Sequence, residues 1–253
     1  MREKSAGVRI AIFLLLLGVP PLLLAEDQSP ANNQALILEN FDEDPPLTFP
    51  ARWKVRGDED VAKVVYRVAE EAGNHFLHAY ADNQDVQIGL TRTFKPKEFP
   101  VLQWRWRVKQ LPKGGDERTV KTNDSAAGVY VVFDSALIPR VIKYVWSSTL
   151  PVGTSMQSPV YWRAKVVVLE SGSSRSDEWE QETINVYEDY KKLFGAEPGE
   201  VQGIAVLTDS NTTKSVAEAD YDDFTLFAAG TASAEETKKT TSQLDPAVVD
   251  GSK

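Results

Sequence analysis

Three glutamates, Glu178, Glu180 and Glu182, stand at every second position of the chain. If this segment is a β-strand, whose side chains alternate between two faces, all three carboxylates lie on one face. Retaining glycosidases use two carboxylates in this way, one as nucleophile and one as acid/base. One interpretation of the spacing is a jelly-roll glycoside hydrolase that uses Glu178 and Glu182. The interpretation that we favour is a solvated strand face, with Trp179 turned toward the core.

The common catalytic motifs are absent from the sequence. It contains no Gly-x-Ser-x-Gly elbow, no phosphate-binding glycine-rich loop, no dinucleotide fingerprint and no His-Glu-x-x-His motif. The chain has no cysteine, which excludes disulfides, zinc–cysteine sites and a thiol nucleophile. His75 and His78 are three residues apart in a predicted strand, so they face opposite sides and do not share a metal. We therefore assign no catalytic residue and favour a binding protein over an enzyme.

Acidic residues gather near both ends of the predicted domain. Glu39 and Asp42 stand near its start, and Asp222 and Asp223 stand near its end. In jelly-roll carbohydrate-binding modules the first and last strands are often neighbours, which brings such acids together. Carboxylate oxygens are the ligands that Ca²⁺ prefers. The sequence therefore predicts a structural calcium ion held by these four side chains.

Residues 101–108 alternate strictly between apolar and polar side chains. A strand has a period of two, so Leu102, Trp104, Trp106 and Val108 share one face and are expected in the core. Arg105 then lies on the opposite, polar face, where it can bridge carboxylates or hydroxyls.

Polar and aromatic residues stand at the ends of other predicted strands. Ligand sites in β-sandwiches lie on the concave face or in the loops at one rim. An exposed tryptophan there stacks on a sugar ring, while aspartate and asparagine bond to its hydroxyls. We therefore predict a glycan-binding or small-polar-ligand site lined by Arg105, Asp124, Trp146, Asp209 and Asn211. The alternative for the aspartates is that they only cap turns.

The body of the chain is a series of short β-type runs separated by turn residues. We predict these runs at 61–69, 76–81, 86–94, 101–108, 129–133, 141–146, 164–169, 179–186, 201–208 and 223–227. Amphipathic helices between them are missing, which excludes a parallel α/β fold. One short helix is expected at 187–194, ended by Gly195. The predicted fold is all-β, an antiparallel jelly roll or β-sandwich.

The first 25 residues resemble a secretory signal peptide, with a basic start, an apolar stretch at 10–24 and a small residue before a polar break. Its removal takes away three basic residues and one acid, which changes the formal net charge from −9 to −11. A chain this acidic is unsuited to binding nucleic acid. We predict a linker at 26–35, a β-sandwich at 36–229 and a disordered tail at 230–253. The mature chain is expected in the periplasm or outside the cell, without a transmembrane span.

An ordered set of motifs resembles a bacterial family catalogued as domain of unknown function 3047. The set runs through Trp104-Arg105-Trp106, Asn123-Asp124, Tyr144-Val145-Trp146, Asp189-Tyr190 and Thr208-Asp209, and ends at Asp220-Tyr221-Asp222-Asp223. The resemblance covers about residues 38–227. It implies an exported protein with a galactose-binding-like β-sandwich and brings no activity with it. This chain has Gly128 and Ser210 where the family pattern often has arginine and aspartate.

Together these features favour a non-catalytic periplasmic β-sandwich that binds a carbohydrate or a cell-envelope glycan. Two alternatives stay open. One is the glycoside hydrolase described above, and the other is a structural partner in envelope assembly, which would present an exposed apolar patch.

Overall fold

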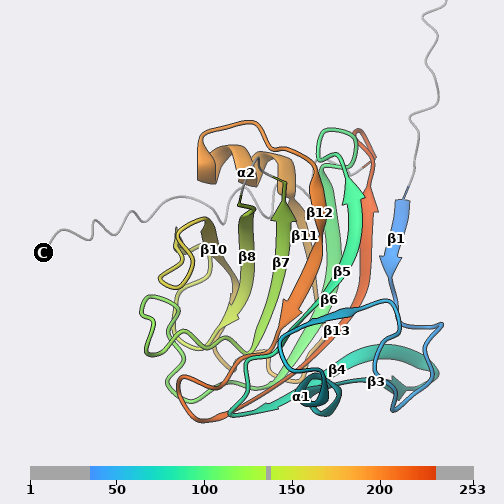
Figure 1. Ribbon diagram of the computed structural model, residues 1–253, viewed down its shortest axis with the longest axis vertical. Helices are drawn as coiled ribbons and strands as arrows, with labels where there is room; N and C mark the ends of the chain where they lie inside the picture. The colour runs from blue at the N-terminus through green and yellow to red at the C-terminus, as the bar shows by residue number, and fades with distance from the viewer. Residues whose placement is uncertain (1–34, 135–137, 232–253) are drawn as a thin grey trace, which may run out of the picture. The chain divides into compact units, whose positions relative to one another are not determined.

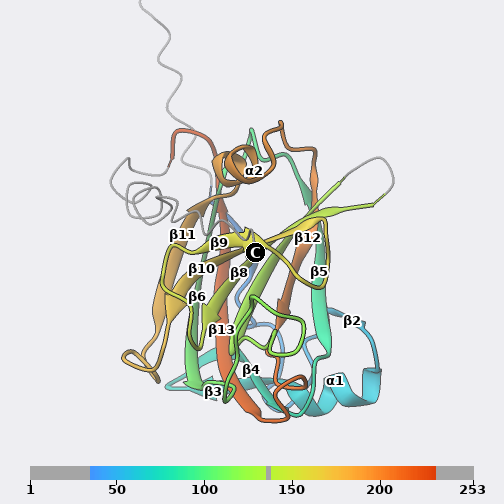
Figure 2. The ribbon, with the colours of Figure 1, turned by 90° about the vertical axis from the view of Figure 1, so that its left-hand side faces the viewer.

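The computed structural model describes residues 35–134 and 138–231, where the chain forms two β-sheets that face each other, with two short helices (Figures 1 and 2). The described elements belong to one compact unit, Ala31–Lys253. The predicted signal peptide, residues 26–34 of the predicted linker and the predicted tail from residue 232 onward lie outside the described residues. Within the described ranges, no helix is long and apolar enough to cross a membrane.

The first sheet has six strands, all paired antiparallel. They are β11 (Glu180–Asn185), β6 (Val101–Gln110), β13 (Val216–Phe227), β4 (Asn74–Asp82) and β3 (Tyr66–Glu71), in that order, with β1 (Ala35–Glu39) also paired to β13. The first and last strands of the domain are therefore neighbours, as expected from the sequence.

The second sheet has seven strands. Their order is β2 (Lys54–Arg56), β5 (Gln87–Phe94), β12 (Val201–Leu207), β7 (Ala127–Phe133), β8 (Arg140–Ser147), β10 (Ala164–Ser171) and β9 (Ser155–Gln157). Strands β8 and β10 are parallel, and the other pairs are antiparallel. The predicted all-β, jelly-roll-like sandwich is confirmed, with one parallel pair that the sequence did not reveal.

The described residues contain two helices where one was predicted. Helix α2 (Val186–Phe194) matches the predicted helix and ends at Gly195, whose φ of 63° lies in the left-handed region that favours glycine. Helix α1 (Glu59–Val65) occupies half of the run predicted as a strand at 61–69. The carboxylate of Asp58 caps it by accepting the N–H groups of the first turn. The two helices lie at opposite ends of the sandwich (Figure 1).

The core lies between the sheets and is rich in aromatic rings. Trp104 and Trp106 of β6 are fully buried and meet Tyr144 and Trp146 of β8, with ring centroids 5.9 Å and 6.1 Å apart. Leu102 and Val108 are also fully buried, so the predicted alternation in β6 is confirmed. Burying each such side chain contributes about 1.5–3 kcal/mol, which makes this aromatic contact a main tie between the sheets.

Candidate functional site

Asp124 and Asp209, two of the predicted site residues, lie close together. Asp124 is fully buried just before β7, and its carboxylate accepts hydrogen bonds from the backbone and the hydroxyls of Thr212 and Thr213. Burial alone would raise the pKa of Asp124, but these four hydrogen bonds lower it below its usual value. Asp124 is therefore a carboxylate that holds the loop after β12 in place.

Asp209 differs from Asp124 in its protonation state. It is 5% exposed, and its Oδ1 has no hydrogen-bond partner among the described residues. Burial raises the pKa of Asp209 to about 8, with Lys143 opposing the rise and Asp124 adding to it. Asp209 is therefore a neutral carboxylic acid at pH 7. Asn211 follows two residues later in the same loop and is half-buried.

Two buried residues that the sequence analysis missed complete this cluster. Lys143 is 4% exposed in β8, with Nζ 3.2 Å from Ser125 Oγ and 5.6 Å from the Tyr130 ring centroid. Glu117 is fully buried and accepts the hydroxyls of Ser125 and Ser147, at 2.9 Å and 2.6 Å. A lysine inside the apolar run of β8 was the available signal. The four ionisable side chains of the cluster are buried, while Asn211 and Thr212 at its edge are half-buried and exposed. The cluster therefore ties loops to the second sheet.

The other two predicted site residues lie elsewhere. The Trp146 ring is fully buried against Trp106, and its Nε1 donates to the carbonyl of Gly172 at 2.9 Å. The expectation of an exposed, sugar-stacking ring at Trp146 is therefore wrong, because Trp146 lies on the core face of β8. Arg105 contacts residues of β4 and β13. The structure thus brings together Asp124, Asp209 and Asn211. Arg105 lies on the other sheet, and Trp146, although next to Ser147 of the cluster, turns its ring into the core.

Arg105 lies on the outer face of the first sheet in a ladder of ion pairs. Its Nη2 is 2.6 Å from Asp222 and its Nε is 2.8 Å from Asp223, as expected for an arginine that bridges carboxylates. Two residues further along β6, Arg107 pairs with the fully buried Asp220 at 2.8 Å. Trp179 covers both guanidinium groups, each 4.7 Å from its ring centroid, and so faces outward instead of into the core.

The four residues predicted to hold calcium are occupied by other partners. Asp222 and Asp223 are paired with Arg105, and Glu39 accepts the indole N–H of Trp53 at 3.1 Å. Asp42 is exposed and accepts from Asn40. In the described ranges, no three His, Cys, Asp or Glu side chains gather as a metal-binding group. These contacts do not fit a shared calcium site, and calcium binding stays a prediction.

Glu178 and Glu182, the two carboxylates that the hydrolase hypothesis requires, do not lie together on one open surface. Glu178 is exposed and precedes β11, while Glu182 is 9% exposed and accepts the indole N–H of Trp106 at 3.2 Å. Glu180 pairs with Arg175 at 2.6 Å. The prediction that all three share one strand is wrong for Glu178, because the chain turns there with Asp177 at a φ of 66°.

A tryptophan that the sequence analysis passed over is the most exposed one. Trp162 is 67% exposed and borders a cavity of about 200 Å³ between the β9–β10 turn and the end of α2. We call its lining the Trp162 patch: Arg140, Gln157, Trp162, Arg163, Lys165, Leu193 and Phe194.

The turn that carries Trp162 is held by a dense set of hydrogen bonds. The Gln157 side-chain amide donates to the carbonyl of Ala164 at 2.6 Å, and the hydroxyl of Tyr161 donates to the carbonyl of Pro139 at 2.7 Å. The Ser158 hydroxyl accepts two backbone N–H groups of the turn. The exposed ring therefore stands on a fixed backbone, which lowers the entropy lost when a ligand binds.

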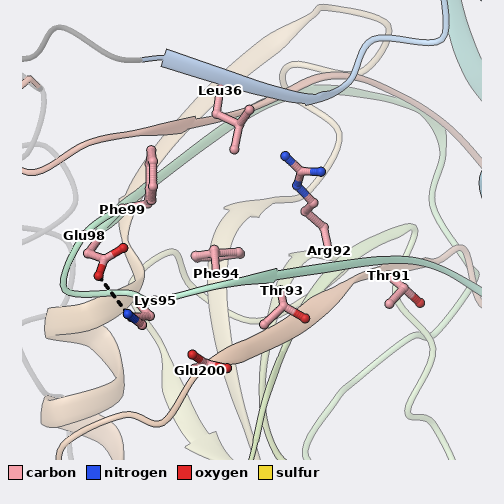
Figure 3. Close-up of a pocket in the computed structure, with 9 residues that line it drawn as sticks. All are labelled: Leu36, Thr91, Arg92, Thr93, Phe94, Lys95, Glu98, Phe99 and Glu200. Carbon is pink, nitrogen blue, oxygen red and sulfur yellow. Dashed lines mark hydrogen bonds and ion pairs between the residues drawn. The ribbon is translucent and has the colours of Figure 1, made fainter.

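A larger cavity, of about 600 Å³, lies between β1 and the end of β5 (Figure 3). Arg92 extends from β5 toward Leu36 on β1, while Lys95 is neutralised by Glu98 at 3.1 Å. Its rings, Phe94 and Phe99, are buried and half-buried. The cavity has no exposed flat ring, so it suits a sugar less well than the Trp162 patch.

Comparison with known protein families shows to which family the chain belongs. A family model described as "Protein of unknown function (DUF3047)" matches residues 51–225, most of the sandwich. The chain belongs to the DUF3047 family. A comparison with curated proteins gave no match.

Several solved structures resemble this DUF3047 chain at low identity. The family 11 carbohydrate-binding module of a Clostridium thermocellum cellulosomal cellulase aligns at a TM-score of 0.38 and 8% identity, covering 78% of this chain and 95% of the module. The family 30 module from the same organism aligns at 0.38 and 11%, covering 77% and 99%. The exolytic PL7 alginate lyase AlyA5 of Zobellia galactanivorans aligns at 0.36 and 11%, covering 70% and 95%. At such scores the ligand must be inferred from this chain's own residues.

Proposed function

We propose that this DUF3047 protein is a β-sandwich that binds a carbohydrate, and that the Trp162 patch is the binding site. The observation that carries the proposal is the exposure of Trp162. Of the six tryptophans, all within the described ranges, Trp162 alone is exposed, at 67%. A ligand that covers this large, fixed ring removes apolar surface from water, which favours binding.

The chemistry of the patch suits a sugar ring. The C–H face of a pyranose is flat and apolar and packs on an indole, whose amphipathic ring favours sites that are half apolar and half wet. The hydroxyls of the sugar need hydrogen-bond partners, and Gln157 and Lys165 supply polar groups beside the ring. Arg163 stands over one face of the Trp162 ring, with Cζ 5.1 Å from its centroid, so we expect the sugar to stack on the opposite face. A cavity of about 200 Å³ accommodates one or two sugar units, so we expect recognition of a short stretch or an end of a glycan.

We further propose that the protein is exported to the periplasm or beyond and binds without catalysis. Export is supported by the basic and apolar pattern of residues 1–25. A non-catalytic role is supported by the lack of known catalytic motifs and by the engagement of Glu180 and Glu182 in contacts with Arg175 and Trp106.

A glycan array with the wild type and three variants tests the proposal. The wild type is expected to bind a subset of glycans, and Trp162→Ala is expected to bind them at least about 30-fold more weakly, since truncating a central tryptophan costs about 2 kcal/mol or more. Trp162→Phe should keep part of the affinity. Trp179→Ala, a ring on the outer face of the first sheet, is the control and should bind as the wild type does. Unchanged binding by Trp162→Ala, or no glycan bound by the wild type, would refute the proposal.

A further inference from the structure

The Trp162 patch is cationic in an acidic protein. Arg140, Arg163 and Lys165 all line its cavity, although the chain carries a formal net charge of −9. Arg140 and Lys165 both stand over the ring of Phe194, with Arg140 Cζ at 5.1 Å and Lys165 Nζ at 6.0 Å from its centroid. Two cations beside one ring repel each other, and a negative charge near them lowers this repulsion.

Within the described residues, the positive charges of Arg140 and Lys165 are only partly offset. Arg140 donates to the hydroxyl of Tyr190 at 2.9 Å, and both cations gain from the Phe194 ring. In residues 35–134 and 138–231, neither Arg140 nor Lys165 forms an ion pair with a carboxylate. The last carbonyls of α2 supply about half an elementary charge, which does not balance two cations. The patch therefore retains a positive charge that a bound anion would neutralise.

Three other buried or half-buried arginines are matched with acids. Arg105 faces Asp222 and Asp223, Arg107 faces Asp220 and Glu71, and Arg175 faces Glu170 and Glu180. Arg140 differs from this pattern, and it does so beside the most exposed tryptophan. The same cavity thus joins an indole for a sugar face to cations for a negative group.

We propose that the ligand of the Trp162 patch is an anionic sugar, one that carries a carboxylate or a sulfate on a ring that stacks on Trp162. This rests on the proposed carbohydrate-binding function and specifies its ligand class. Arg140 forms one fixed side of the anion site, because Tyr190 holds its guanidinium in place and a planar guanidinium matches either anion. Lys165 supplies a second charge from β10, in the strand that follows the Trp162 turn.

Calorimetry with paired ligands tests the inference. The probes are an oligogalacturonate and the same oligosaccharide with its carboxyl groups reduced to alcohols, and a sulfated galacto-oligosaccharide and its desulfated form. At least one charged probe is expected to bind about tenfold or more tightly than its neutral partner, because hydrogen bonds to a charged group are stronger than those to a neutral one. The pair that shows the difference identifies carboxylate or sulfate as the recognised anion.

Variants connect the charge preference to the patch. Lys165→Gln should weaken binding of the charged probe about tenfold and leave its neutral partner unchanged, and Lys165→Glu should abolish binding of the charged probe. The control is Lys121→Gln, which removes the charge of an exposed lysine in the loop between β6 and β7 and should change nothing. Melting curves confirm that all three variants are folded.

The outcomes separate this inference from the function on which it rests. Equal binding of charged and neutral probes, lost in Trp162→Ala, would overturn the anionic ligand and leave carbohydrate binding at the patch intact. The same holds if only neutral glycans bind. If no probe and no arrayed glycan binds the wild type, both proposals fall. A charge preference that survives Lys165→Glu would overturn the assignment of the anion to this patch.

Discussion

At Asp209, burial changes the chemistry of an ordinary carboxyl group. The side chain is buried beside Lys143 and Asp124, and its pKa is raised to about 8. Between about pH 4 and pH 8, the folded protein keeps the proton on Asp209, whereas the unfolded chain has lost it. Unfolding therefore releases a proton in this pH range. The contribution of Asp209 to stability is therefore greatest at low pH and is lost as the pH rises through 8.

Asp209→Asn tests this assignment at the residue scale. The wild type should lose up to about 1.4 kcal/mol of unfolding free energy per pH unit through this group between pH 5 and 8, and the variant should lack that part of the slope. Urea unfolding at several pH values measures it. Asp82→Asn, at an exposed position on β4, is the control and should keep the wild-type slope. Parallel curves for the wild type and Asp209→Asn would contradict the raised pKa.

The tryptophans show which parts of a binding site are readable from single residues. The core position of Trp146 follows from its alternation with Ile142 and Tyr144, a signal that was present in the sequence. Trp162 stands in a turn with no period, so its exposure depends on how the β9–β10 turn packs against Pro139 and the end of α2. Similarly, Arg105 was correctly placed on the polar face of β6, but its partners come from distant strands.

Among the elements, β13 connects most of the first sheet, since it pairs with β1, β4 and β6. On its outer face, Asp220 is fully buried and accepts from His78 Nδ1 at 2.7 Å and from Arg107 Nε at 2.9 Å. Burial opposes ionisation, but His78, Lys109 and Arg107 lower the pKa of Asp220 below its usual value. One carboxylate thus links β4, β6 and β13.

Asp220→Ala should therefore cost about 3–5 kcal/mol of stability, because it leaves the 7%-exposed Arg107 without its buried partner. Denaturant unfolding measures the loss. Glu218→Gln, two residues away on the same face of β13 and 3.9 Å from His78, should cost less than about 1 kcal/mol. Equal costs for the two changes would show that Asp220 does not link the strands in this way.

The strands themselves were largely predictable, because alternation and turn residues are local signals. The runs at 76–81, 86–94, 101–108 and 164–169 lie within β4, β5, β6 and β10 or overlap them closely. The short strands β1, β2 and β9 were missed, since three to five residues carry too little pattern. Helix α1 was read as strand because Val61, Val64 and Val65 favour β structure locally, whereas the Asp58 cap fixes the helix.

At the scale of the whole molecule, the acidic charge and the cationic patch act over different distances. A net charge of −9 repels an anionic polymer, but at physiological salt this repulsion fades within about 8 Å. Attraction at the Trp162 patch is a contact effect between Arg140, Lys165 and the ligand. We therefore expect a short acidic oligosaccharide to bind at the patch although the protein as a whole is acidic.

The most direct test of carbohydrate binding at Trp162 is the indole N–H resonance of this residue in a nuclear magnetic resonance titration. Trp162→Phe assigns the resonance among the six indoles. With the tightest-binding oligosaccharide, the Trp162 resonance should shift and saturate in step with the calorimetric binding curve, while the resonances of buried Trp104 and Trp146 stay in place. A Trp162 resonance that does not move while binding saturates would contradict the account.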